Sequence, residues 1–487
     1  MKGERDMLLI SAIVFPAVAG VIASLVKAEY RKRCLYYAII MILTDILGIL
    51  SILKGGQWIS PDFVQNVNFT FFLDGIGKYV LAAVLILYTA ACFYAFEYMS
   101  VEERQPVFFG FYFVSLGAMI AVCMAGNLVT LYFSFEMATL SSMPLVLHEM
   151  DKAAIAAAMK YLFYSIAGAL LGLLGTFFIY YYAADPTGTF KMGGFLDMSA
   201  LAGNESLFLL IIFLTIIGFG TKAGMYPMHG WLPSAHPIAP APASSLLSGI
   251  IAKAGVLAII RVIYYSVGAD FIRGTWVQYV WMSICMLTIF MGSMMAFRES
   301  VLKKRLAYST ISQISYILLG LSILSESGLE GALLHLMSHV ASKGCLFLAA
   351  GVFIYKLHKR NVKDLKGVGK QMPITMWCFT IASLSLVGIP PLGGFLSKWV
   401  IAGAAIESGT GVFAFLPPVI LLISALLTAG YLLPVVVDAF FPGADFVPDG
   451  PAKAEPTALM TIPMIVLCIT ALGVGLFGAQ IVGMLGL

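Results

Sequence analysis

The sequence has few charged residues for its length, and this scarcity decides its class. Charged residues make up 11% of the 487 residues and hydrophobic residues 60%, with a mean hydropathy of +0.95. A soluble domain carries roughly 25% charged residues, because its surface faces water. The composition excludes a soluble fold, and it also excludes a soluble domain with one membrane anchor. We expect a polytopic membrane protein.

Motifs that would hold a redox centre, a metal ion or a nucleotide are also missing. The seven cysteines stand singly in or beside apolar runs, and no CxxC or Cys/His spacing suggests zinc or an iron–sulfur cluster. No long hydrophilic domain and no phosphate-binding glycine loop occurs. We therefore expect no cofactor, no metal, no nucleic-acid partner, and no redox or hydrolytic site in this chain.

Apolar stretches of membrane-spanning length recur along the whole chain. A membrane helix needs about 17–25 residues, and helices rather than barrel strands follow from these lengths. We expect about fourteen transmembrane helices, near 7–26, 35–53, 74–97, 107–125, 128–147, 159–183, 207–226, 241–266, 276–297, 306–325, 330–355, 373–404, 411–437 and 459–485. The first apolar run lacks a small-residue cleavage site, so we expect it to be retained. The polar stretches near 184–206 and 438–458 are predicted surface loops.

Basic residues gather in alternate loops. They are most frequent after the first, ninth and eleventh spans, whereas the even-numbered loops carry isolated cations. Short loops rich in lysine and arginine stay in the cytoplasm. We expect odd-numbered loops inside the cell and both termini outside, although Lys2 and Arg5 argue weakly for the reverse.

Several predicted spans carry ionisable side chains. A charge at the centre of a span costs at least roughly 2.5–3.5 kcal/mol, so each needs a reason. A single lysine near a span end could snorkel to the headgroups, and a lone histidine could hold a structural hydrogen bond. The candidate ion-translocation residues are Glu136, Lys222, Lys253, His335, His339, Lys343 and Lys398.

Three of these candidates share one helix face. His335, His339 and Lys343 are spaced i, i+4 and i+8, so they form a polar stripe about two turns long. Histidine, with an ordinary pKa of about 6.5, exchanges protons readily. A structural histidine needs no second histidine and lysine beside it, so the spacing favours a proton relay.

Two spans are interrupted at corresponding places. One has Lys222 followed by Gly224 and Pro227, and the other has two prolines and three glycines within 388–394, followed by Lys398. Matching interruptions in two halves are typical of inverted-repeat transporters with an ion site at the breaks. Two unrelated proline kinks would give the same pattern.

Four blocks in this order resemble one family. They are KAGMYPMHGWLPSAHP (222–237), LAYSTISQ (306–313), HLMSHVASK (335–343) and GIPPLGGFLSK (388–398). The sequence is similar to the antiporter-like membrane subunits of respiratory complex I, Mrp-type cation/proton antiporters and energy-converting (group 4) membrane hydrogenases. Relatives often have an acidic residue where this chain has Val301, and some have glutamate at the position of Lys398. The chain also ends without the long lateral helix of the largest complex I relative.

The resemblance implies an all-α fold of fourteen helices, with helices 4–8 and 9–13 as inverted five-helix repeats and helices 7 and 12 broken. It divides the chain into 1–106, 107–270, 271–440 and 441–487: three N-terminal helices, the two repeats as half-channels, and helix 14. It also implies roles: Glu136 pairs with Lys222 in the first half-channel, Lys253 and the stripe form a central polar axis, and Lys398 ends the second half-channel.

The leading function is therefore a proton- or sodium-translocating subunit of a multisubunit membrane complex, driven by redox chemistry elsewhere. The alternative is a Mrp-type sodium/proton antiporter subunit without a redox module. A subunit that itself binds quinone, haem or flavin, and a stand-alone permease, fit the residues less well. Expected partners are homologous and other membrane subunits, lipid, and indirectly peripheral redox subunits, in the plasma membrane of a prokaryote.

Overall fold

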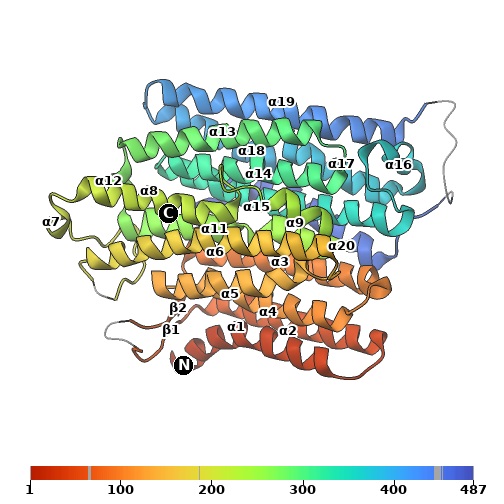
Figure 1. Cartoon of the computed structure of the whole chain (residues 1–487), viewed down its shortest axis with the longest axis horizontal. Helices are drawn as coiled ribbons and strands as arrows, with labels where there is room; N and C mark the ends of the chain where they lie inside the picture. Colours follow the sequence, from red (N-terminus) through yellow and green to blue (C-terminus); the bar gives the residue numbers. More distant parts are fainter. Residues whose placement is uncertain (1, 64–66, 186, 444–450, 452, 486–487) are drawn as a thin grey trace.

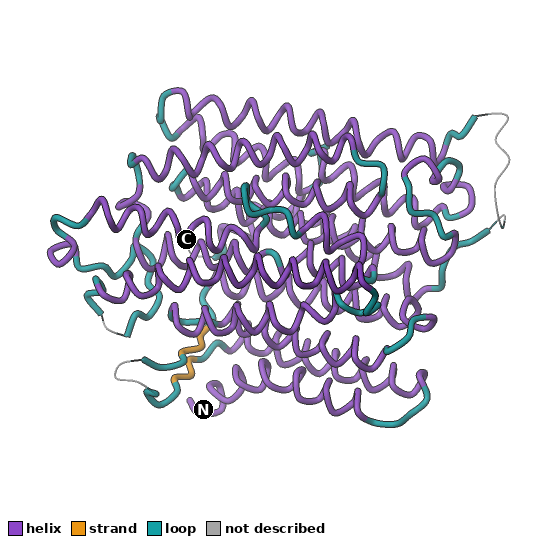
Figure 2. Tube along the Cα trace, viewed as in Figure 1, coloured by secondary structure: helices purple, strands orange, loops and turns teal. Residues whose placement is uncertain are grey.

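The protein is a bundle of long, roughly aligned helices (Figures 1 and 2). A computed structural model describes residues 2–63, 67–185, 187–443, 451 and 453–485. Within this part of the chain, eleven helices are long and apolar enough to cross a membrane. Ten of the eleven are α1 (Lys2–Leu25), α2 (Tyr30–Lys54), α3 (Gly75–Tyr98), α4 (Gln105–Met124), α6 (Lys152–Tyr181), α8 (Glu205–Ala223), α13 (Trp276–Arg298), α15 (Glu326–Leu357), α19 (Val412–Phe440) and α20 (Ala458–Gly483), and the eleventh is the helical stretch 241–267. Two further long helices, α5 (Leu128–Val146) and α14 (Leu302–Ser322), are less apolar.

Other helical segments are short or interrupted. A continuous helical stretch over 241–267 alternates α-helix and π-helix: α10 (Ala241–Leu246), η2 (Leu247–Ile251), α11 (Lys253–Ile260) and η3 (Arg261–Val267). Helix α9 (Leu232–Ile238) follows the break after α8, and α17 (Pro373–Val387) and α18 (Gly393–Glu407) flank a second break. The remaining helices are η1 (Met99–Val101), α7 (Met198–Leu201), α12 (Ala269–Ile272), η4 (Val362–Leu365) and α16 (Val368–Gln371).

Each of the fourteen predicted ranges falls on helix, but three do not meet the same length and apolarity test. Helices α5 and α14 carry polar or basic residues, and the range 373–404 is divided between α17 and α18, which have 15 residues each. An antiparallel pair of strands, β1 (Gln57–Ile59) and β2 (Thr70–Phe72), was not predicted. Three residues per strand are too short for a detectable alternation.

Burial separates a lipid-facing shell from a polar centre. Large apolar side chains stand exposed on outer helices, for example Phe163 on α6 at 70% and Leu422 on α19 at 65%. In contrast, the 18-residue apolar window within 241–267 is completely buried. Such an outer surface suits hydrocarbon rather than water, and the central helices are where charged groups can be sheltered.

The connections form two opposite faces of the bundle. On one face, Val301 bridges Asn361, and Lys356 forms an ion pair with Glu97 at 3.0 Å. On the other, β2 bridges Ala125, and the amide of Gly193 donates to the carbonyl of Tyr264 at 2.9 Å. The first face carries the loops rich in basic residues, which we call the basic-loop face. The N and C marks both lie on the left side of Figure 1, with β1, β2 and α7.

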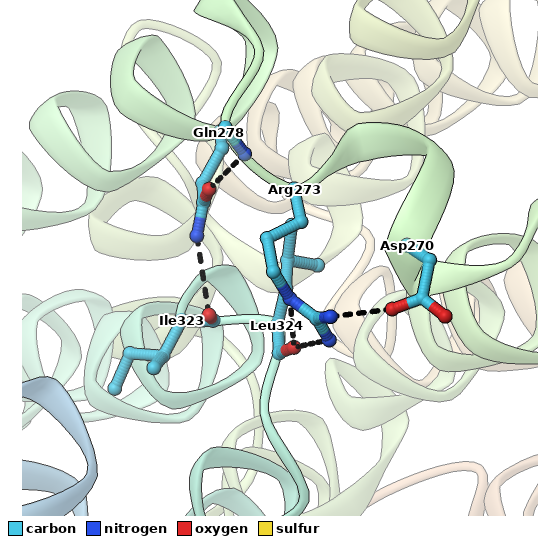
Figure 3. A network of polar contacts seen from close by, with 6 residues as sticks. Asp270, Arg273, Gln278, Ile323 and Leu324 are labelled. Atoms are coloured by element: carbon cyan, nitrogen blue, oxygen red, sulfur yellow. Dashed lines mark hydrogen bonds and ion pairs between the residues drawn. The ribbon is translucent and has the colours of Figure 1, made fainter. Parts of the chain in front are cut away.

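Two polar clusters pin connections together on the face opposite the basic loops. Arg273 donates to Asp270 at 2.5 Å and to the carbonyl of Leu324, while Gln278 donates to the carbonyl of Ile323 at 3.1 Å (Figure 3). These contacts hold the α12–α13 connection against the α14–α15 turn.

The second cluster is an ion pair between Asp74, the N-cap of α3, and Arg261. The guanidinium donates to both carboxylate oxygens at 2.5 and 2.7 Å, and the arginine is fully buried. This two-bond geometry satisfies a buried cation well. It fastens α3 to η3, and no sequence motif predicted it.

Candidate functional site

Six of the seven candidate residues lie in the buried centre of the bundle. Lys222 on α8, Lys253 on α11, the three stripe residues on α15 and Lys398 on α18 are at most 9% exposed. Glu136 on α5 is only half-buried, between the exposed side chains of Phe133 and Met137. The structure therefore gathers the basic candidates and leaves the acidic one at the edge.

Lys222 occupies the last turn of α8, where the helix breaks. Gly224 ends the helix with φ 79°, a left-handed conformation that glycine adopts without strain. The ammonium donates to Thr139 Oγ1 at 2.9 Å and to the hydroxyl of Tyr161 at 2.5 Å, and it lies 4.4 Å from the Tyr161 ring centroid. A cation near a helix C-terminus also gains from the helix dipole. These groups hold a charged lysine without a carboxylate in contact.

The expected pairing of Glu136 with Lys222 is not a direct ion pair in the described structure. Their charged atoms are not within 4.0 Å, and Thr139 and Tyr161 hold the ammonium instead. Glu136 is nevertheless the acidic group that acts electrostatically on Lys222. Glu136 is on α5 and Lys222 is on α8. Thr139, which accepts a hydrogen bond from Lys222, lies on α5 about one helical turn after Glu136.

Lys253 lies at the junction between η2 and α11. Its ammonium donates to the carbonyl of Ser248 and lies 2.6 Å from His339 Nδ1. Ser248 lies within the π-helical turn η2, and such turns are frequent at functional sites. The contact joins α11 to the stripe on α15.

The stripe continues from His339 toward α18. The rings of His335 and His339 are 6.2 Å apart, and His335 Nδ1 lies 2.9 Å from Ser397 Oγ. The Nε2 atoms of both histidines are buried without a hydrogen-bond partner in the described structure. Lys343 donates to the carbonyl of Leu306 on α14 at 3.0 Å. The two histidines thus link Lys253 to Ser397, and Lys343 lies at the other end of the stripe.

Lys398 completes the line at the second helix break. Its ammonium donates to the carbonyls of Leu386 and Val387, the last residues of α17, at 2.6 and 3.0 Å. It also lies 5.1 Å from the ring of Tyr316, whose edge meets the ring of His335 at a centroid distance of 5.1 Å. Exposed carbonyls at a helix C-terminus attract a cation.

The arrangement forms a line of titratable groups between the two helix breaks. It runs from Lys253 through His339 and His335 to Lys398. Lys222 lies on α8, which packs closely against Gly255 of α11, two residues after Lys253. A histidine with one bonded and one unbonded ring nitrogen can take a proton on one side and release it on the other. Gaps longer than one hydrogen bond can be bridged by water.

His236 belongs to the sequence block 222–237 but is not one of the predicted site residues. It is fully buried, neither ring nitrogen has a hydrogen-bond partner in the described chain, and it stacks on Phe347 at 4.7 Å. Lys303, Lys343 and Lys253 all act on it electrostatically. It lies on α9, three residues before Ala239, whose carbonyl accepts a hydrogen bond from Lys303. Tyr161 and Ser397 were also missed, because hydroxyl residues carry no signal without their neighbours.

The basic-loop face also carries two polar pockets, which are not lined by His236. A pocket of about 240 Å³ is lined by Glu102, His148 and Glu149, and a smaller one by Glu149 and Lys303. Burial, followed by repulsion from Glu149, raises the pKa of the Glu102 carboxyl. Burial and the nearby Arg104 lower the pKa of His148. Ionisable groups therefore line both pockets on that face.

Comparison with known proteins identifies the family of this chain. The family model described as "NADH:quinone oxidoreductase/Mrp antiporter, TM" matches residues 125–427. The chain belongs to this family. The resemblance inferred from the four sequence blocks is therefore confirmed.

Named relatives of this antiporter-like family are subunits of membrane complexes. The chain is 32% identical to NADH-quinone oxidoreductase subunit N of Desulforudis audaxviator, over 84% of this chain and 82% of that protein. It is 33% identical to hydrogenase-4 component B of Escherichia coli, over 70% of this chain and 51% of that protein, about half its length. In fold it is similar to a chain of the Mrp complex from Dietzia sp., with a TM-score of 0.83, 20% identity, and coverage of 98% and 96%.

Proposed function

We propose that this chain is a proton- or sodium-translocating subunit of a multisubunit membrane complex, with redox chemistry in other subunits driving transport. The observation that carries the proposal is the buried line from Lys253 through His339 and His335 to Lys398. So many titratable groups at membrane depth would be costly without a role. Their charge states are coupled, so a proton entering at one group changes the proton affinity of the next.

The two half-channels meet at the stripe. In the first, Lys222 and Glu136 load the ion at the break after α8, and in the second, Lys398 releases it at the break between α17 and α18. His236 and the pockets around Glu149 connect the central lysines with the basic-loop face. Lys343 adjusts the stripe electrostatically from its position beside α14.

The proposed architecture follows from the same residues. It has fourteen membrane crossings, with helices 4–8 and 9–13 as inverted repeats and helices 7 and 12 broken. The repeats occupy 107–270 and 271–440, after three N-terminal helices (1–106) and before helix 14 (441–487). The basic-loop face lies in the cytoplasm and both termini lie outside, in the plasma membrane of a prokaryote. Support comes from the breaks after Ala223 and Val387 and from the grouping of basic loops on one face.

A Mrp-type sodium/proton antiporter subunit is the second candidate, favoured by the fold likeness to the Mrp complex. The two candidates differ in what the purified complex does. A redox-driven complex takes up ions in vesicles only when electron donor and acceptor are supplied. A Mrp-type complex exchanges sodium for protons along a preformed gradient without them.

Lys222→Ala tests the shared core of both candidates. Ion uptake into vesicles by the intact complex should fall at least tenfold, while immunoblots show normal subunit content, because alanine fits sterically at the end of α8. The matched control is Lys152→Ala, which changes an exposed lysine at the start of α6 and should leave uptake unchanged. Normal uptake by Lys222→Ala would remove this lysine from the mechanism.

A further inference from the structure

An acidic residue outside the line of titratable groups lies deep in a peripheral helix. Asp45 is 15 residues from the first and 9 from the last residue of α2, which spans Tyr30–Lys54. At 1.5 Å per residue these separations are about 22 and 14 Å. The carboxylate is therefore too deep for the headgroup region, and it is not part of the stripe. An ionisable residue in such a position is a candidate functional site.

The contacts of Asp45 inside the chain are incomplete. Thr89 on α3 donates one hydroxyl to both carboxylate oxygens, at 3.0 and 2.8 Å. No nitrogen of a described lysine, arginine or histidine lies within 4.0 Å of the carboxylate. An ionised carboxyl offers about four acceptor positions, and one hydroxyl donor fills only part of them. A positive group from outside the chain would complete the site.

Asp45 also forms part of the wall of an apolar groove. The groove has a volume of about 550 Å³ and lies between α2, α3 and the beginning of α20. Its floor is one face of α3, where Ala82, Ile86, Ala90 and Phe93 are spaced i, i+4, i+8 and i+11. This floor is about 16 Å long at 1.5 Å per residue. Small residues on a helix face let another helix approach closely.

The rim of the groove is exposed apolar surface. Ile49 on α2 is 50% exposed, and Ile462 and Val466 on α20 are 57% and 43% exposed. Apart from Asp45 and Thr89, the lining is hydrophobic. The shape and depth suit a membrane helix, and the single carboxylate on the wall adds a requirement for its charge.

We infer that this groove binds a transmembrane helix of another subunit, and that this helix presents a lysine or arginine to Asp45. This inference rests on the proposed function only in requiring a multisubunit complex. The charge of Asp45 requires a cation from whatever fills the groove. A lipid tail carries no cation, and the amine of a lipid headgroup cannot reach this depth. An ion pair within the membrane fixes both the depth and the rotation of the partner helix, which apolar packing alone does not.

Site-directed photocrosslinking in the intact complex tests the inference. A benzophenone amino acid at Ile49 or at Val466 should crosslink to one segment of one other subunit, and that segment should contain a lysine or arginine. The control position is Leu422 on α19, which is exposed outside the groove and should not give this product. Crosslinks to lipid only, to a second copy of this chain, or to a segment without a basic residue would overturn the inference.

Charge variants separate the ion pair from packing. Asp45→Asn keeps the side-chain shape and should lower the crosslink yield and the co-purified partner at least tenfold. Replacing the partner's cation by aspartate together with Asp45→Lys should restore both. Thr89→Val removes the internal donor but leaves the carboxylate, so it should retain the partner. Unchanged crosslinking in Asp45→Asn would refute the charge requirement.

A failure of this inference can be distinguished from a failure of the proposed function. Lys222→Ala should reduce transport at least tenfold and leave the groove crosslink intact, because Lys222 lies on α8, away from the groove. Loss of the crosslink in Asp45→Asn at normal levels of this chain would, conversely, locate the defect at the interface.

Discussion

Gly255 sets the distance between α8, which carries Lys222, and α11, which carries Lys253. A methyl group at this position would lie 2.4 Å from the carbonyl oxygen of Phe219 and 3.0 Å from Lys222 Cβ, whereas ordinary contacts are 3.4–4 Å. The Phe219 carbonyl belongs to the backbone of α8 and cannot rotate away. Gly255→Ala therefore has to move α8 and α11 apart by about 1 Å, the difference between the clash and an ordinary contact.

This displacement should reduce the rate of ion transport more than it reduces folding and assembly of the subunit. Overpacking destabilises the folded state by roughly 1–3 kcal/mol, and the higher helix propensity of alanine offsets about 1 kcal/mol of this loss. The subunit should therefore still assemble. A misplacement of about 1 Å between reacting groups can cost about a hundredfold in rate. We expect ion uptake per assembled complex to fall at least tenfold, measured in vesicles and normalised by immunoblot.

Gly403→Ala is the matched control. Gly403 lies within α18, where a methyl group would meet no atom within 4 Å, so the same substitution should leave uptake and assembly unchanged. If Gly255→Ala instead assembles and transports at the normal rate, close approach of α8 and α11 is not required. The connection between Lys222 and Lys253 would then have to be abandoned.

Three further changes test other parts of the structure. His339→Gln keeps a hydrogen bond to Lys253 but cannot carry a proton, so uptake should stop while the complex still assembles; normal uptake would make this histidine structural. Asp74→Asn keeps the N-cap of α3 but leaves Arg261 buried without its counter-charge, which costs about 3–5 kcal/mol. The melting temperature and the yield of the complex should therefore fall. The double variant Asp74→Asn/Arg261→Gln should recover part of both. His236→Gln should slow uptake and leave the melting temperature unchanged, whereas a lower melting temperature with normal uptake would assign His236 to packing.

Hydrophobic runs predicted the helices well because a membrane helix must satisfy its own backbone and expose apolar side chains. Proline and glycine near 224–227 and 388–394 also marked where α8 and α17 end. The same method missed β1 and β2, whose pairing depends on partner strands. Within the range 373–404, the predicted interruption at 388–394 separates α17 from α18.

The site was predicted as a set of residues but not as a set of contacts. Depth and spacing singled out Lys253 and His339, because charges in spans are rare. The hydroxyl groups around them, such as Tyr161 and Ser397, are common in membrane helices and became visible only through their distances to Lys222 and His335. The pairing of Glu136 with Lys222 stays a prediction, because sequence gives no distance between α5 and α8 and the ammonium contacts Thr139 and Tyr161.

The sequence by itself determined that the chain is a membrane-embedded helix bundle with lysines and histidines inside it, since these properties are local and follow from hydropathy and helical period. Tertiary structure alone decided which groups touch. It brought Lys253 to His339 and His335 to Ser397, and it left Asp45 beside an open apolar groove. Such contacts depend on how helices distant in the chain rotate and pack, and small residues such as Gly255 set those approaches through steric contact.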